Sequence, residues 1–189
     1  LTLSGANTYT GVTTISAGTL QLGDGLTSNG SVTGSITNNA ALAFANPTAQ
    51  SYSGVVSGSG SLTKTGAGTL TLSSANSYTG ATLLDLGQIT LADGGSLGAT
   101  AVTVGSGVAT TATAGHATLV VEGNITLGTA SGGSLTIRGG NTGGSPIGQG
   151  TLSLQDGALN TLTLANTTSG ATNLVLGGAA GNAALLRLD

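Results

Sequence analysis

The sequence contains no cysteine, methionine or tryptophan, and only two of its 189 residues are proline. Without cysteine, neither a disulfide framework nor a thiolate metal site can form. Three tyrosines and one phenylalanine are the only aromatic residues, so a hydrophobic core has to be built from Leu, Val, Ile and Ala. No apolar run approaches the ~18 residues of a membrane-spanning helix.

Charge is also scarce, since three basic and six acidic residues give a formal net charge of -3. A nucleic-acid interface needs several Lys or Arg side chains to neutralise phosphates. A basic amphipathic helix on a membrane surface needs them too. We therefore expect no nucleic-acid partner and no direct membrane insertion by this segment. Intrinsic disorder is also excluded, because disordered chains are poor in apolar residues, whereas 38% of this chain is hydrophobic.

Glycine is abundant, with 35 residues, but it does not follow the G-X-Y pattern of collagen. Instead, the chain contains an internal repeat. Residues 70–94 are identical to residues 1–25 at 14 of 25 positions, when Leu70 is aligned with Leu1. The tripeptide Tyr-[Ser/Thr]-Gly also recurs, beginning at Tyr9, Tyr52 and Tyr78. These spacings predict a structural unit of about 20–23 residues.

Short apolar alternations recur along the whole chain and predict strands with one buried face. Clusters of Gly, Asn, Ser and Asp between them predict corners. No apolar stripe with a helical period persists, so we expect almost no helix. The alternations lie at residues 1–3, 20–22, 42–44, 70–72, 89–91, 102–104, 125–127, 135–137, 152–154, 162–164, 174–176 and 186–188.

This combination predicts an all-β fold, a parallel β-helix (β-solenoid). A single coil with two or three strands cannot bury its leucine face alone, so coils have to stack. Antiparallel sandwiches space their strands about 8–12 residues apart but lack such a repeat. We predict one domain over residues 1–189, with about nine coils of ~19–27 residues.

Two further features concern the organisation of this domain. The longest stretch without a strand pattern, RGGNTGGSPIGQG at 138–150, predicts a protruding loop and a candidate partner contact. The chain opens directly in Leu-Thr-Leu, without the charged start and apolar core of a signal peptide. We interpret it as a fragment of a longer protein.

The corners are the positions that the sequence marks most clearly. Asn7 and Asn76 precede the Tyr-[Ser/Thr]-Gly tripeptides. We expect these asparagines to adopt a left-handed backbone and to close hydrogen bonds between coils. We expect the tyrosines to pack beside the corners with their hydroxyls in water. The predicted structural corner residues are Asn7, Tyr9, Gly11, Tyr52, Gly54, Asn76, Tyr78 and Gly80.

Several patterns associated with catalysis or phosphate binding are better explained as corners. Gly94-Gly-Ser96-Leu-Gly98 matches a nucleophile elbow, but that motif requires a strand-to-helix turn with partner Asp and His residues. His116 is the single histidine, and no second His or Cys can join it on a metal. The glycine-rich stretches 57–60, 105–107 and 143–150 lack the Lys-[Ser/Thr] of a phosphate loop.

The carboxylates do not suggest a catalytic or calcium site either. Asp24 and Asp93 are equivalent in the repeat, and we expect turn-capping roles, because two carboxylates cannot supply the six to eight oxygens of calcium. Asp85 and Asp93 could share a coil, but a glycosidase would also need aromatic subsites. We therefore predict a non-enzymatic protein with no catalytic residue, no metal and no cofactor.

Outward-facing threonines leave an alternative open. A flat threonine ladder could order water, as in ice-binding solenoids, although threonine is also the ordinary β-branched partner of leucine in strands. The three tyrosines could contact sugars, but they make a thin aromatic platform. The alternative function is an ice-binding or a polysaccharide-binding or polysaccharide-degrading solenoid. The threonines concerned are Thr2, Thr71, Thr90, Thr103, Thr126, Thr136 and Thr163.

The run GSGSLTKTGAGTLTLSSANSYTG, residues 58–80, resembles the autotransporter-associated β-strand repeat of passenger domains in bacterial type V secreted proteins. Residues 1–23 match it again, and the likeness covers about 1–25 and 58–94. The resemblance implies a right-handed parallel β-helix at a Gram-negative cell surface or outside the cell, serving in adhesion or as a stalk.

The surface of such a β-helix also predicts its partners. Nearly neutral faces and open strand edges favour homotypic association, either lateral or end to end. A host or surface receptor is the other candidate partner.

Overall fold

The computed structural model describes residues 1–92, 94–98, 101–105 and 117–121, together with the strands that follow them in the chain. This part of the chain contains 21 strands and no helix. Every pairing between these strands is parallel. The predicted all-β, parallel solenoid is confirmed.

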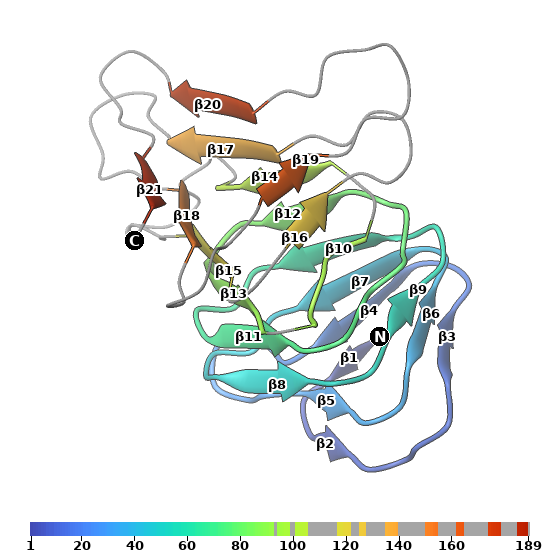
Figure 1. The fold of residues 1–189 in the computed structure, drawn as a ribbon. Coiled ribbons are helices and arrows are strands. Elements are labelled where there is room, and N and C mark those ends of the chain that lie inside the picture. The colour runs from blue at the N-terminus through green and yellow to red at the C-terminus, as the bar shows by residue number, and fades with distance from the viewer. Residues whose placement is uncertain are drawn as a thin grey trace.

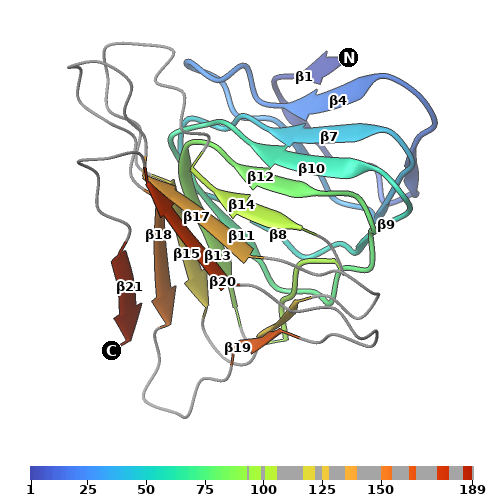
Figure 2. The ribbon, with the colours of Figure 1, turned by 90° about the horizontal axis from the view of Figure 1, so that it is seen from above.

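The longest stack is an eight-stranded sheet (Figure 2). In spatial order it contains β1 (Thr2–Leu3), β4 (Thr19–Leu22), β7 (Ala41–Phe44), β10 (Ser61–Lys64), β12 (Thr82–Leu84), β14 (Val102–Val104), β17 (Leu135–Gly139) and β20 (Leu174–Gly178).

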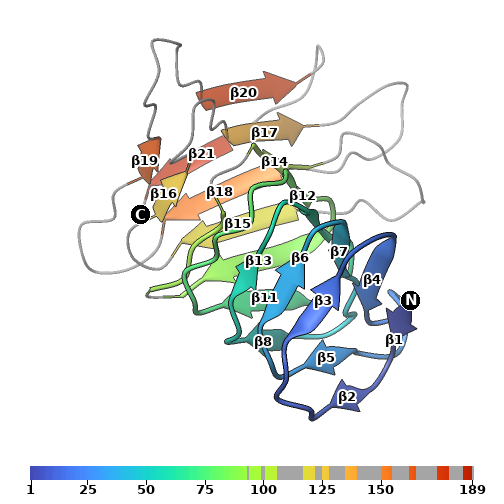
Figure 3. The ribbon, with the colours of Figure 1, turned by 90° about the vertical axis from the view of Figure 1, so that its right-hand side faces the viewer.

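A six-stranded sheet forms the second side. It contains β8 (Gln50–Tyr52), β11 (Thr69–Leu72), β13 (Gly87–Leu91), β15 (Ala117–Val121), β18 (Gly150–Leu154) and β21 (Leu185–Leu188). The pair β2 (Ala6–Asn7) and β5 (Ser31–Val32) continues this stack next to β8 (Figure 3).

A three-stranded sheet forms the third side and contains β3 (Thr13–Ile15), β6 (Ile36–Asn38) and β9 (Val56–Ser57). A separate pair, β16 (Ile125–Leu127) and β19 (Leu162–Leu164), lies further along the chain.

The first coils are three-sided, because the chain passes in turn through the eight-stranded sheet, the stack formed by the β2–β5 pair and the six-stranded sheet, and the three-stranded sheet (Figure 1). Successive pairings in the eight-stranded sheet define about five turns of nearly constant length. They join Leu3 to Leu22, Leu22 to Phe44, Phe44 to Lys64, Lys64 to Leu84 and Leu84 to Val104.

The later pairings of this sheet join strands that are separated by longer stretches of chain. Val104 pairs with Ile137, and Ile137 pairs with Leu176. Longer connections leave fewer coils for the same length of chain. The nine coils predicted from the sequence are not confirmed.

The apolar alternations located the strands well. All twelve predicted segments lie within or overlap strands. The proposed loop at 138–150 is too long, because Arg138 and Gly139 extend β17, where they pair with Gly177 and Gly178 of β20. Gly150 already begins β18. Residues 140–149 lie outside the described residues.

The core is a set of ladders in which equivalent residues of successive coils stack at the ~4.8 Å strand spacing. Each buried aliphatic side chain contributes roughly 1.5–3 kcal/mol by leaving water. The inner ladders of the eight-stranded sheet contain Leu20, Leu42 and Leu62, and Leu22, Phe44, Lys64, Leu84 and Val104.

The sequence repeat corresponds to one coil that closes on itself. Leu3, near its start, pairs with Leu22, near its end, and Leu72 pairs with Leu91 in the second copy. The first pair lies in the eight-stranded sheet and the second in the six-stranded sheet. The first copy therefore begins in the eight-stranded sheet and the second in the six-stranded sheet. The distance between them is a whole number of turns and about one further side of the solenoid. Equivalent residues of the two repeats occupy different sides of the solenoid.

Candidate functional site

The corner asparagines connect neighbouring coils through their side-chain amides. The Nδ2 atom of Asn76 donates to the carbonyls of Ser74, at 3.1 Å, and Ser96, at 2.7 Å. Its Oδ1 accepts the backbone N–H of Val56 at 2.8 Å. Asn76 thus links three coils. Asn7 makes the two corresponding donor hydrogen bonds, from its Nδ2 to the carbonyls of Gly5 and Ser31, each at 3.0 Å.

The expected left-handed backbone of these asparagines is wrong. Among the described residues, every positive φ belongs to a glycine, for example Gly58 at 99° and Gly87 at 78°. The amide side chain reaches the neighbouring coils without a left-handed backbone, so the asparagine does not need that strained conformation.

The glycines that follow the tyrosines differ in how closely other atoms approach them. Gly54 and Gly80 do not have a positive φ. A Cβ atom at Gly80 would overlap with the carbonyl oxygen of Gly60, and one at Gly54 would overlap with the Tyr52 hydroxyl. Gly11, in contrast, has nothing within 4 Å of its Cβ position. Close stacking of coils, rather than backbone conformation, explains the first two glycines.

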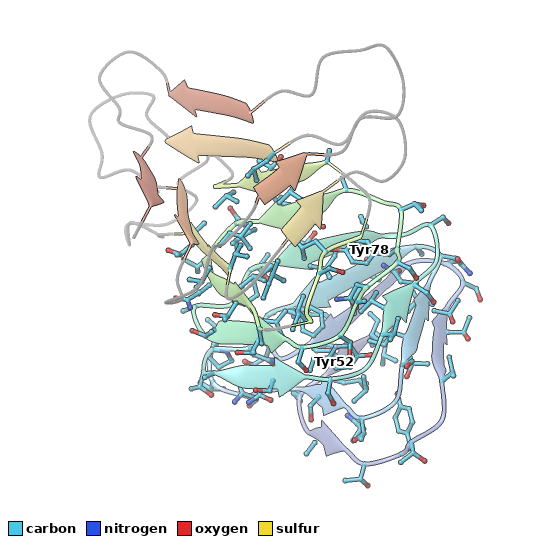
Figure 4. All side chains as sticks on the ribbon, viewed as in Figure 1. Tyr52 and Tyr78 are labelled. Carbon is cyan, nitrogen blue, oxygen red and sulfur yellow. The ribbon has the colours of Figure 1, made fainter. Side chains whose placement is uncertain are left out.

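Two of the three tyrosines lie inside the solenoid, which corrects the expectation of water-facing hydroxyls (Figure 4). The hydroxyl of Tyr78, a residue with 0% exposure, is 2.6 Å from Thr82 Oγ1, and that of Tyr52 donates to the Gly34 carbonyl at 2.9 Å. Burial raises the pKa of both phenols to about 12. Each phenol finds a partner inside the corner, so neither is available to a sugar. Tyr9 is 43% exposed.

Lys64 is a buried cation that the sequence analysis missed. It pairs with Phe44 and Leu84 in an inner ladder and is 1% exposed. Its Nζ donates to the carbonyls of Gly66 and Leu86 at the corner that follows β10 and β12. Burial lowers its pKa to about 8. The alternation in Ser-Leu-Thr-Lys was the available signal, because it places Lys64 on the same side as Leu62.

Asn38 and Asn46 are buried polar residues that the sequence analysis also missed. Asn38 is fully buried, and its Nδ2 donates to the Ser61 carbonyl at 2.8 Å. The Oδ1 of Asn46 accepts the Gly30 N–H at 2.7 Å. Both asparagines lie two positions after an inward-facing apolar residue, so the strand period continues into the corner. Their hydrogen bonds offset the cost of burying an amide.

The pattern at Gly94–Gly98 forms a corner and does not display a nucleophile. Ser96 bridges to Ala75 in the previous coil, and its Oγ accepts the Asn76 N–H at 3.2 Å. A Cβ at Gly98 would overlap with the Tyr78 carbonyl oxygen. His116 and residues 106–107 and 143–149 of the glycine-rich stretches lie outside the described residues.

Asp24 caps a turn, as predicted. Its Oδ1 accepts the N–H groups of Leu26, Thr27 and Ser28 at 2.8–2.9 Å. These three hydrogen bonds hold the pKa of the carboxyl well below its usual range. Asp93, and with it the Asp85–Asp93 pair, lies outside the described residues.

The described residues include no group of three His, Cys, Asp or Glu side chains that could hold a metal ion. A pocket beside Phe44, Asn46 and Tyr52 measures about 10 Å³, room for one water molecule. In this part of the chain no helix is long and apolar enough to cross a membrane.

The outward threonines do not form one array. Thr2, Thr103 and Thr136 belong to the eight-stranded sheet. Thr71 and Thr90 belong to the six-stranded sheet, where Thr90 is only 6% exposed. Thr126 and Thr163 face each other in the β16–β19 pair. The threonines are therefore divided among three sheets.

The described geometry is that of a parallel β-solenoid with an apolar core and tightly stacked corners. Comparison with known proteins shows similarity in two segments of the chain. Residues 1–22 and 62–91 match the passenger-associated-transport-repeat. The adhesin BmaC autotransporter of Brucella suis is 52% identical over 52 residues, which are 28% of this chain and 2% of that protein. No solved structure matches the chain.

These two matches confirm the resemblance to autotransporter passenger domains that the sequence indicated. The chain belongs at the cell surface or outside the cell of a Gram-negative bacterium. It spans only a small part of the length of its adhesin relative. Each matched segment contains a coil that closes on itself, because Leu3 pairs with Leu22 in the first and Leu72 pairs with Leu91 in the second.

Proposed function

We propose that this segment is a non-enzymatic stalk that holds the passenger of an adhesin-type autotransporter together and away from the cell. The observation that supports this proposal is the uninterrupted inner ladder of the first five turns, whose strands pair on both sides. Such stacks gain stability with each added coil, because each coil buries the apolar face of its neighbour. The adhesin name of the Brucella relative agrees with this role.

We further propose that the coil is right-handed and that the stalk associates with like molecules. Connections between parallel strands are right-handed in about 98% of cases. A chain with only 5% charged residues offers little electrostatic repulsion between copies. A host or surface receptor would then bind elsewhere on the passenger or on its loops.

Sedimentation velocity on the 189-residue chain tests the association. We expect the average sedimentation coefficient to rise as the protein concentration is raised from about 5 to 200 μM, the range of weak homotypic contacts. A single monomeric species over the whole range would contradict self-association. Loss of association on raising salt would also contradict it, because the proposed contact is not electrostatic.

A further inference from the structure

The three-stranded sheet has an outward surface of hydroxyl and valine side chains. Its side chains form two columns, and we name this surface the hydroxyl face. In one column Thr14 pairs with Thr37, which pairs with Ser57. The other column lies two positions earlier in the chain, at the residue that precedes each strand. The hydroxyl face consists of Val12, Thr14, Ser35, Thr37, Val55 and Ser57.

This face is partly open to solvent, because Ser35, Thr37 and Ser57 are half-buried, and it carries apolar side chains beside its hydroxyls. Val12 is 63% exposed and Val55 is 38% exposed, two of the most exposed large hydrophobic residues in the described part of the chain. Thr14 is also exposed. Strands β3 and β6 lie side by side on the side that faces the viewer in Figure 3.

The hydroxyl face is self-complementary. None of its six residues is charged, and each hydroxyl is both a donor and an acceptor. A ladder of hydroxyls can therefore pair with an identical ladder without any opposite charge. The small side chains allow two sheets to approach to the ~10 Å spacing of packed sheets.

The described carboxylates are positioned to favour contact through this face. Asp24 lies between β4 and β5, and Asp85 lies between β12 and β13. Both belong to the corner at which the chain leaves the eight-stranded sheet for the six-stranded stack. In a three-sided coil that corner is opposite the three-stranded sheet. Two negatively charged chains that meet through their hydroxyl faces keep these carboxylates far apart.

We propose that the hydroxyl face is the lateral contact between two copies of this chain. A second copy has the same ~4.8 Å rung spacing, so hydroxyl columns can match at every rung across a two-fold axis. Exposed Val12 and Val55 leave water in the same contact. This assignment rests on the proposed self-association and adds the surface through which it occurs.

The proposed contact is tested in the full chain by placing charges at two paired positions of neighbouring strands. The test variant is Thr37→Glu with Ser57→Glu, and the matched control is Ala43→Glu with Thr63→Glu on the outer side of β7 and β10. We expect the test variant to associate about tenfold or more weakly than the unmodified chain, because four carboxylates would meet in one contact. The control should associate as the unmodified chain does. Circular dichroism and melting confirm that both variants fold.

A charge-swapped partner makes the test specific for a second copy. Thr37→Lys with Ser57→Lys, mixed with the Glu variant, should restore association that neither variant shows alone. If the Glu variant associates as strongly as the unmodified chain, the hydroxyl face is not the contact and the proposal is overturned. The proposed self-association would still hold. An unmodified chain that stays monomeric contradicts the proposed self-association. If that monomer sediments with insoluble cellulose and the Glu variant does not, the face binds polysaccharide and the proposal is overturned.

Discussion

At the residue scale, the solenoid accommodates polar groups inside its core by giving each a partner in a corner. The Asn76 amide links three coils, and the Tyr78 hydroxyl contacts Thr82 at 2.6 Å. Lys64 differs from these because it is charged at neutral pH and is held only by two backbone carbonyls. A buried charge without a counterion opposes folding.

We expect the stability of the folded chain to rise between pH 7.5 and 9.5. The pKa of Lys64 is lowered to about 8 in the folded state, whereas an unfolded lysine titrates near 10.4. Between these values the unfolded state binds more protons, so the free energy of unfolding increases with pH, by on the order of 1–2 kcal/mol. Thermal melting across this range measures the effect.

The variant Lys64→Met should abolish the rise, and it is a clean control because Lys64 is the single lysine. Above pH 10 stability should fall in both proteins. The phenols of Tyr52 and Tyr78 have folded-state pKa values of about 12, so the unfolded state loses its protons first. A melting temperature of the unmodified chain that does not change between pH 7.5 and 9.5 would contradict a buried charged Lys64.

At the element scale, the corners decide how closely the strands of successive coils can stack. A glycine is needed where one corner rests on the backbone of the next, as Gly98 rests on Tyr78 and Gly80 on Gly60. Strand alternation identifies the ladders but contains no information about these approaches. Gly11, which ends the same Tyr-Thr-Gly tripeptide as Gly80, has open space at its Cβ position. Its coil has no described neighbour on that side.

We expect Gly98→Ala to destabilise the chain by about 1–3 kcal/mol, because the added Cβ meets the backbone of Tyr78 and forces the coils apart. Gly11→Ala is the matched control. It should leave stability unchanged or raise it by up to about 1 kcal/mol, through the lower entropy of the unfolded chain. Urea denaturation measures both. Equal effects of the two substitutions would show that the corners do not stack as described.

At the scale of the whole molecule, the solenoid is a one-dimensional stack in which a sequence repeat is one closed coil. Leu70 pairs with Ile89 in the neighbouring strand of the same sheet, so the chain returns to the same side after one turn. A stack of this kind tolerates the loss of a whole coil better than the loss of part of one.

Deletion of residues 70–88 should therefore give a chain that still folds. Ile89 and Leu91 would take the places of Leu70 and Leu72 against β8. We expect a loss of about 1–3 kcal/mol, the share of one coil in the stability of a typical domain. Circular dichroism and cooperative melting test this outcome.

Deletion of residues 70–79 is the comparison. It removes about half a coil and moves every later strand to a different side, so we expect no cooperative transition. A cooperative melt for the half-coil deletion equal to that for the full coil would contradict the three-sided stack.

The sequence by itself determined the strands, the parallel stacking and the resemblance to autotransporter passenger domains. Apolar alternation with period two and a repeat of about 20 residues suffice for these, because they reflect burial of one strand face and its repetition. Only the tertiary structure decided which side each residue occupies. The two copies of the repeat lie in different coils and on different sides, and Tyr9 is exposed while its equivalent Tyr78 is buried. The burial of Lys64 and the fit of Gly98 against Tyr78 likewise depend on neighbouring coils, which a local pattern does not record.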